Sequence, residues 1–249
     1  MRLTILGSGT VTPLLDRNSA GYLLEIDNKR LLFDSGAGTI RRLSELNVSL
    51  LDLSYLFYTH LHNDHINDLG AIIFDNNYGL PRKKPLNLFG PVGFNEYYEI
   101  LINKLLKPHK LNFKINVKEL GESTIKMGNI KIKTYPTIHS NTTKSIIYRI
   151  EHKGKSLVYT GDTEYCKEAI EAAKNADYLM TECSFPDNKK AEGHLTPSLA
   201  GKIAAKAKVK TLVLTHFYPE VLKTNIKKAC SKEFKGKIIL AKDKLKINI

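Results

Sequence analysis

Residues 59–65, Thr59-His60-Leu61-His62-Asn63-Asp64-His65, directly follow the apolar run of residues 53–58. This stretch holds three imidazoles and one carboxylate, donors of the kind that bind zinc or a similar divalent metal. In a loop at a strand end, His60 and His62 can face one side while Asp64 and His65 turn toward a neighbouring position. A polar loop with solvated histidines is the alternative, but the chain has only 8 histidines. The stretch therefore predicts a loop that serves two metals.

Three further donors each follow a predicted strand. His139 follows the run 130–136, Asp162 follows the run 155–159, and His216 follows the run 212–215. Taken singly, each is an ordinary polar residue of the surface or core. Because loops at the carboxyl ends of strands gather into one site, we expect the three to join the first cluster. Together the seven residues are sufficient for two metals with open positions for water and substrate.

Short β-like runs alternate with longer amphipathic stretches, which predicts an α/β protein. The predicted strands are residues 2–6, 20–26, 30–34, 54–58, 130–135, 145–151, 155–159, 177–182, 211–215 and 237–247. The predicted helices are residues 38–46, 66–76, 92–106, 164–174, 197–208 and 219–231. No Pro/Gly/Ser-rich linker interrupts the series. The turn-rich segment 121–128 is the strongest candidate for a junction between two halves of one compact domain, residues 1–249.

The composition is that of a globular protein with excess positive charge. The 249 residues are 42% hydrophobic and 25% charged, which excludes disordered, collagen-like and fibrous chains. Lys and Arg number 38 against 25 Asp and Glu, a net charge of +13. The excess includes Arg82-Lys83-Lys84 and the lysine-rich stretch 220–249. It fits an anionic partner, and a solvated lysine-rich surface accounts for it equally well.

The cysteines and the apolar runs predict a cytoplasmic protein. Cys166, Cys183 and Cys230 have no short paired spacing, so neither a disulfide framework nor a cysteine-based zinc site is indicated. The sequence from Met1 shows no signal-peptide pattern, and no uncharged apolar run reaches membrane-spanning length. We therefore expect no membrane association.

The metal-binding pattern resembles that of the metallo-β-lactamase-fold hydrolases. The resemblance rests on His60-x-His62-x-Asp64-His65, His139, Gly161-Asp162-Thr163 and His216, in this order along the chain. It implies an αββα sandwich of four layers with the site at one edge of the two sheets. It also implies that His60, His62 and His139 hold one metal, that Asp64, His65 and His216 hold the other, and that Asp162 bridges them.

Within that superfamily the chain is most similar to the ribonuclease Z branch. The shared features are the Leu6-Gly7-Ser8-Gly9-Thr10 opening, the strand end Phe33-Asp34-Ser35-Gly36 and the His-x-Thr element in Gly193-His194-Leu195-Thr196. Pro197 then stands at a first helical turn. The resemblance implies that His194 binds the scissile phosphate or protonates the leaving oxygen; a helix-capping neighbour without a catalytic role is the alternative.

Two departures from that branch bear on the substrate. Ribonuclease Z enzymes that process tRNA precursors commonly insert a long tRNA-gripping arm before the Gly-Asp-Thr motif, whereas here only 23 residues separate His139 from Asp162. The helix after the metal loop begins Ile66-Asn67-Asp68-Leu69, where the tRNA enzymes usually carry Gly-Leu-Pro. Both differences argue against tRNA while leaving phosphodiester chemistry intact.

The expected activity is metal-dependent phosphodiester hydrolysis of the ribonuclease Z type. We expect two divalent ions, zinc first and manganese or iron as alternatives, with a metal-bound hydroxide as nucleophile. Asp64 would orient that hydroxide or accept its proton, and His194 would act as acid or phosphate ligand. Asp34 would fix a ligand imidazole from behind.

Three other functions compete with this expectation. Lactonases and glyoxalase-type thioesterases share the fold but usually carry Gly-Gly where this chain has Asn67-Asp68. Flavo-di-iron proteins place Glu at the position of His62. A metal-free scaffold that binds RNA would lose ligands, whereas all seven are present. The expected partners are a phosphodiester substrate, with RNA as one candidate, and, by resemblance, a second copy of the chain in a homodimer.

Overall fold

The computed structural model describes residues 1–79 and 81–249, which form two sheets covered by helices. The strands are β1 (Arg2–Gly7), β2 (Gly21–Ile26), β3 (Lys29–Ser35), β4 (Leu53–Phe57), β5 (Leu86–Pro91), β6 (Ile115–Leu120), β7 (Ser123–Met127), β8 (Ile130–Thr137), β9 (Ser145–His152), β10 (Lys155–Tyr159), β11 (Tyr178–Glu182), β12 (Thr211–Thr215), β13 (Lys237–Leu240) and β14 (Lys246–Asn248). The α-helices are α1 (Thr39–Glu45), α2 (Asn63–Ile66), α3 (Leu69–Phe74), α4 (Phe94–Ile100), α5 (Lys167–Ala173), α6 (Pro197–Lys206), α7 (Pro219–Leu222) and α8 (Ile226–Glu233). The 3-10 turn η1 (Leu50–Asp52) and the wider π-type turns η2 (Asp75–Gly79) and η3 (Leu101–Leu106) complete the series.

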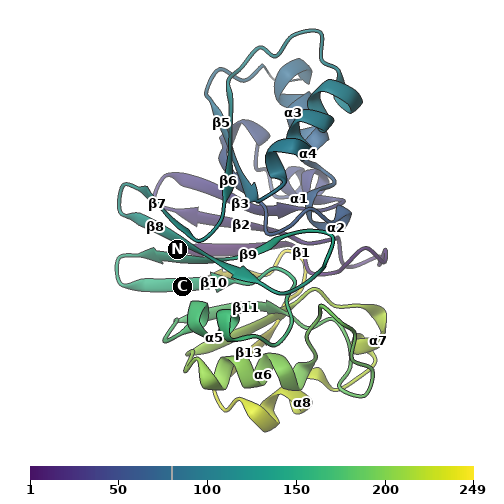
Figure 1. The fold of residues 1–249 in the computed structure, drawn as a ribbon, viewed down its shortest axis with the longest axis vertical. Helices are drawn as coiled ribbons and strands as arrows, with labels where there is room; N and C mark the ends of the chain where they lie inside the picture. Colours follow the sequence, from purple (N-terminus) through teal and green to yellow (C-terminus); the bar gives the residue numbers. More distant parts are fainter. Residues whose placement is uncertain (80) are drawn as a thin grey trace.

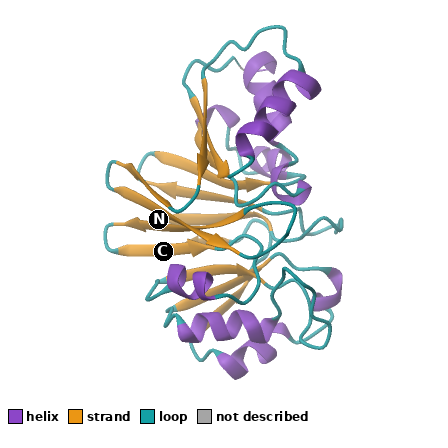
Figure 2. Cartoon of the chain, in the orientation of Figure 1, coloured by secondary structure: helices purple, strands orange, loops and turns teal. Residues whose placement is uncertain are grey.

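Each sheet has seven strands and combines parallel with antiparallel pairs. The first sheet runs β14-β1-β2-β3-β4-β5-β6, and the second runs β13-β12-β11-β10-β9-β8-β7. β3 to β6 and β10 to β13 are parallel. Helices connect these parallel strands, as such connections require. The α1–α4 group covers the outside of the first sheet, and the α5–α8 group covers the outside of the second (Figures 1 and 2). This arrangement is the predicted αββα sandwich.

The strands bury both faces because each sheet packs on its partner sheet and on helices. In β2, Tyr22, Leu24 and Ile26 point into the core between the sheets, while Leu23 points into the core beneath the helices. Side chains of a strand alternate between faces, so this sequence fills two cores at once. The two sheets are therefore packed on both faces, and the ends of their strands lie along one edge of the sandwich.

Helix α6 begins where the sequence predicts it. The Thr196 side chain accepts a hydrogen bond from the Leu199 N–H, and Pro197 occupies the first turn, where its missing N–H is no loss. Among the described residues, no helix combines the length and the apolar character needed to cross a bilayer.

Three sequence predictions about elements are wrong in detail. The stretch 219–231 is two helices, because the Asn225 side chain caps a new helix by accepting from the Lys228 N–H. The stretch 237–247 is two strands that belong to different sheets. β5, β6 and β7 were not predicted; β7 is an edge strand without a fully buried residue, so its apolar pattern is weak. The chain passes from the first sheet to the second between Leu120 and Ser123.

Asp243 ties the C-terminal segment to the loop that follows β1. Its carboxylate accepts hydrogen bonds from the N–H and hydroxyl of Ser8 at 2.9 and 2.8 Å and from the Asn18 N–H at 2.8 Å. The Arg42 guanidinium adds an ion pair at 2.9 Å. Since the side chain of Asp243 is only 5% exposed, these contacts are shielded from water. The loop 8–18 is therefore held at both ends by one carboxylate.

Candidate metal centre

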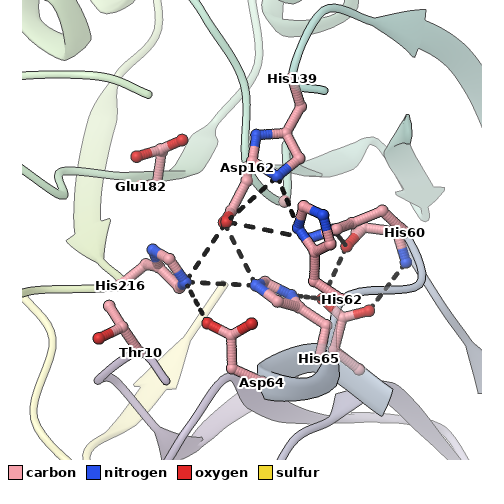
Figure 3. A network of polar contacts seen from close by, with 12 residues as sticks. Thr10, His60, His62, Asp64, His65, His139, Asp162, Glu182 and His216 are labelled. Carbon is pink, nitrogen blue, oxygen red and sulfur yellow. Dashed lines mark hydrogen bonds and ion pairs between the residues drawn. The ribbon is translucent and has the colours of Figure 1, made fainter. Parts of the chain in front are cut away.

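All seven predicted ligands lie at one edge of the sandwich, just beyond the carboxyl ends of strands (Figure 3). His60 and His62 follow β4, Asp64 and His65 lie on α2, and the other three follow β8, β10 and β12. The short helix α2 turns Asp64 and His65 inward, where both are buried. Segments that are far apart in sequence thus place their donors together at this edge of the sandwich.

The donors form two groups of three, which share Asp162 as a neighbour. His60, His62 and His139 offer ligand atoms within 4.8 Å of one another, and so do Asp64, His65 and His216. The Asp162 carboxylate lies 3.3 Å from His65 Nε2 and 3.4 Å from His216 Nε2 in the second group. It also lies 3.9 Å from His60 Nε2 and 3.8 Å from His139 Nε2 in the first. Asp162 is therefore placed between the two groups.

Four of the imidazoles are oriented from behind through Nδ1, which turns Nε2 toward the site. The partners of Nδ1 are the Thr59 hydroxyl for His60 at 3.1 Å, Asp34 for His65 at 2.8 Å, the Gly193 carbonyl for His139 at 2.8 Å and the Ser184 hydroxyl for His216 at 2.9 Å. Such partners fix the tautomer and ring direction of metal-binding histidines. The four Nε2 atoms are thus presented together.

The unpartnered atoms of the cluster fit divalent cations. His60 Nε2 and Asp162 Oδ1 are buried without a hydrogen-bond partner, a costly state for polar atoms in a protein interior. His139 Nε2 faces His62 Nδ1 at 3.0 Å, although the Nδ1–H of His139 is already given to Gly193. Divalent cations held by the two groups of donors would give these atoms partners. The donor set, five imidazoles and two carboxylates, is one that zinc accepts.

The pKa values of the cluster also indicate that its two carboxylates carry negative charge, which a cation would neutralise. Burial raises the pKa of Asp162, but His216, His65 and His60 together hold it well below its usual range. Burial likewise raises the pKa of Asp64, and His216 and His65 bring it down to about 2. Both carboxylates are therefore ionised. Burial lowers the pKa of His60 well below its usual value, with His65 adding to the effect, so its imidazole is neutral and able to bind a metal.

Asp34, expected to fix one of the ligand imidazoles, lies behind His65. It is fully buried at the end of β3 and takes a left-handed backbone conformation with φ of 53°. Its carboxylate accepts hydrogen bonds from the Thr59 N–H, the Thr59 hydroxyl, the Tyr159 hydroxyl and His65 Nδ1 at 2.6–2.9 Å. The left-handed backbone conformation and the four hydrogen bonds hold the Asp34 carboxylate in place. One of these bonds sets the direction of the His65 ring.

Glu182 is a buried carboxylate of the site that the sequence reasoning missed. It is the last residue of β11, 1% exposed, and it accepts from His194 Nδ1 at 3.0 Å and from the Thr163 N–H at 2.8 Å. Ser184 links it to His216 by donating a hydrogen bond to Glu182 and receiving one from His216 Nδ1. The signal was available, because Glu182 is a charged residue at the carboxyl end of an apolar strand, like the ligands themselves.

His194 is brought to the same site, where its neighbours favour the protonated imidazole. Burial lowers its pKa, but the charge and hydrogen bond of Glu182, together with Asp162 and Asp64, raise it to about 9. Its Nδ1 lies 3.9 Å from the Asp162 carboxylate. With Nδ1–H directed at Glu182, the other ring nitrogen is free to act on a bound molecule.

The basic cluster at residues 82–84 is not wholly available to an anionic partner. Arg82 is 3% exposed, and its guanidinium donates to Asn76 Oδ1 at 2.6 Å and to the carbonyls of Leu50 and Leu53. Burial lowers its pKa. Arg82 therefore holds the loop before β5 against the turn before β4. This structural role is not evident from its place in the basic run Arg82-Lys83-Lys84.

Comparison with known proteins agrees with this geometry. Ribonuclease Z of Thermococcus onnurineus is 29% identical over 87% of this chain and 84% of its own length. The metallo-β-lactamase fold protein YhfI from Bacillus subtilis superposes with a TM-score of 0.87 at 25% identity, covering 99% of this chain and 98% of that one. The short form of human tRNase Z superposes with a TM-score of 0.81 at 24% identity, covering 100% and 99%.

These likenesses and the metal-binding cluster identify a metal-dependent hydrolase of the metallo-β-lactamase fold, similar to ribonuclease Z. A family model described as Anti-Pycsar protein Apyc1 matches residues 1–237. Because that match spans nearly the whole chain, the chain belongs to the Apyc1 family of anti-Pycsar proteins.

Proposed function

We propose that this protein hydrolyses phosphodiester bonds with two divalent ions, zinc first among them. His60, His62 and His139 would hold one ion, Asp64, His65 and His216 the other, and Asp162 both. The observation that carries the proposal is the pair of three-donor groups with the Asp162 carboxylate between them. When bound, two such ions lower the pKa of a water and neutralise charge that builds on the phosphoryl oxygens.

The chain's own residues supply the proton transfers. Asp64 is ionised and lies 3.2 Å from His216 Nε2, and we assign it the role of orienting the attacking water and accepting its proton. The water oxygen bonds to phosphorus, and the bond from phosphorus to the leaving oxygen breaks. The protonated His194 gives its proton to that oxygen, while Glu182 holds the imidazolium in place.

A compact phosphodiester is the substrate that we propose, with RNA as one candidate. The curated relatives named ribonuclease Z favour RNA. The interval between His139 and Asp162 is largely occupied by β9 and β10, which leaves no room there for a tRNA-gripping arm. The description of the family names Pycsar as what its members oppose.

The proposal is tested with bis(p-nitrophenyl) phosphate and a lactone assayed side by side. The zinc-loaded protein should hydrolyse the phosphodiester, lose activity after chelation and regain it when zinc is returned. Metal analysis should give two ions per chain. Activity on the lactone alone, or fewer than one ion per chain after loading, would contradict the proposal.

Two variants separate the role of His194 from a general loss of fold. His194→Gln should lower the rate on an unactivated dinucleotide by about 10²–10⁴-fold, and lower it far less on a nitrophenyl ester, whose leaving group needs no proton. His152→Gln is the matched control, because His152 is a buried histidine that pairs with Asp27 outside the metal cluster. Equal losses on both substrates in His194→Gln would count against an acid role.

We also propose that two copies of the chain form a homodimer. The support is an exposed apolar surface on α3, η2 and η3, where Phe74 is 45%, Tyr78 50% and Leu105 69% exposed. Exposed apolar groups gathered in this way commonly mark protein contacts. Light scattering of the purified protein tests this, and Leu105→Glu should shift a dimer to monomer.

The remaining expectations also stand as proposals. We propose one catalytic domain over residues 1–249, supported by the core that both sheets share and by the return of β14 to β1. A single cooperative unfolding transition tests it.

We propose a cytoplasmic location, supported by Cys166, Cys183 and Cys230, which are free and buried. Fractionation of the cells that produce the protein tests that location.

A further inference from the structure

Two aromatic side chains stand beside the metal centre in positions set by the register of the sheet. β11 and β12 pair in parallel with Glu182 opposite Thr215, and Phe185 and Tyr218 each lie three residues beyond one of these partners. Their rings stack with centroids 4.7 Å apart and an interplanar angle of 19°. Adjacent strands thus deliver a pair of flat rings to the edge where the ligands lie.

The pair borders the proton donor. The Phe185 ring lies 5.6 Å from the His194 ring at 64°, and the Tyr218 ring lies 6.2 Å from it at 76°. Tyr218 also meets the metal ligand His216 at 6.0 Å and 81°. In the proposed reaction the leaving oxygen accepts a proton from His194, so whatever that oxygen carries lies next to these two rings.

Core packing does not account for the pair. The residues next to them in sequence, Pro186 and Phe217, are buried, whereas Phe185 and Tyr218 remain partly exposed. Each loop therefore turns one apolar side chain inward and leaves an aromatic ring at the surface beside the site. Aromatic rings in such a position serve as stacking platforms for nucleic acid bases, whatever the identity of the base.

We propose that Phe185 and Tyr218 form a subsite that stacks on a flat group carried by the leaving alcohol, such as the base of a nucleoside. This inference rests on the proposed phosphodiesterase function and on His194 as proton donor. It makes the two rings determinants of which side of a phosphodiester is released. Diesters whose leaving alcohol bears a base should be preferred over those with a small aliphatic alcohol.

Adenosine 5′-(methyl phosphate) tests the inference within one molecule. Breakage of the bond to the nucleoside oxygen gives adenosine and methyl phosphate, and breakage of the bond to the methyl oxygen gives adenosine monophosphate and methanol. The two alcohols differ little in reactivity, so the product ratio reports how the diester sits in the site. The zinc-loaded wild-type protein should favour adenosine by about tenfold or more.

Variants of the pair should change this ratio rather than only the rate. Phe185→Leu and Tyr218→Leu should bring the ratio close to one, and Tyr218→Phe, which keeps the ring, should retain the wild-type ratio. Tyr178→Leu is the control, because Tyr178 is an aromatic residue at the opposite end of β11. Metal content is measured for each variant. If Tyr218→Leu loses its metals, the product ratio of Phe185→Leu alone decides the test.

The outcomes distinguish this inference from the proposed function. Hydrolysis of bis(p-nitrophenyl) phosphate with a wild-type product ratio near one, or with an unchanged ratio in Phe185→Leu, would overturn the inference alone. If the protein cleaves only bis(p-nitrophenyl) phosphate, inhibition of that reaction by adenosine is measured in place of the product ratio. Its inhibition constant should then rise about tenfold or more in Phe185→Leu, and an unchanged constant would overturn the inference. Failure to cleave either diester would overturn both.

Discussion

Replacement of Asp34 by Asn tests whether the metal centre depends on the carboxylate behind His65. Oδ2 accepts from the Thr59 and Tyr159 hydroxyls and from His65, while Oδ1 accepts from the Thr59 N–H. An amide offers only one accepting oxygen, so in either orientation its NH₂ group faces a donor. With the amide oxygen at the Oδ2 position, the bond from the Thr59 N–H is lost at about 1.5–3 kcal/mol, and the other three bonds lose their charged acceptor at about 0.5–1 kcal/mol each. We expect Asp34→Asn to lower the free energy of unfolding of the metal-free protein by about 3–5 kcal/mol.

Urea unfolding and metal titration measure the two consequences separately. Zinc affinity should fall by about 10–100-fold, because His65 loses the partner that sets its direction. The control is Asp52→Asn, which removes an exposed ion pair with Arg30 and should cost less than about 1 kcal/mol. If Asp34→Asn were no more destabilising than this control, or bound zinc as tightly as wild type, the reasoning would be refuted.

Three further changes have expected outcomes. Arg82→Met should lower the free energy of unfolding by about 3 kcal/mol in urea, since buried carbonyls lose a charged donor; a loss under 1 kcal/mol would contradict the burial argument. In the metal-free protein, the raised pKa of His194, about 9, adds stability that is complete below pH about 6.5 and is lost as pH rises through 9. Relative to His194→Gln, wild type should therefore lose up to about 3 kcal/mol between pH 6 and 10, and parallel pH curves would argue against this charge. Gly193→Ala places a Cβ 2.1 Å from the His139 carbonyl and should weaken zinc binding at least tenfold by calorimetric titration. Gly154→Ala has a similar φ in open space and should leave zinc binding unchanged.

The clustering of the seven predicted ligands could be anticipated because their chemistry is concentrated in few residues. His60, His62, Asp64 and His65 stand together in one short loop, and the remaining ligands obey the rule that loops meet at strand ends. The same rule, applied to carboxylates as well as to motif residues, leads to Glu182. The contacts behind the ligands, such as Ser184 on His216, depend on which strands are neighbours, and a single sequence does not reveal strand order.

The element errors have causes that the pattern of apolar residues does not contain. The break before α8 depends on a hydrogen bond from Lys228 to the Asn225 side chain. The break between β13 and β14 follows from the contacts of Asp243 with Ser8 and Asn18, far away in sequence. Edge strands such as β7 carry a mixed pattern because solvent covers part of them.

The attachment of Asp243 to the loop 8–18 also joins an early part of the chain to a late one. That loop carries Thr10, a buried neighbour of Asp64 and His216 in Figure 3. During translation the loop emerges early, but its anchor is synthesised more than two hundred residues later. We therefore expect the loop 8–18 to gain this anchor only after all seven predicted ligands, the last of which is His216, have been synthesised.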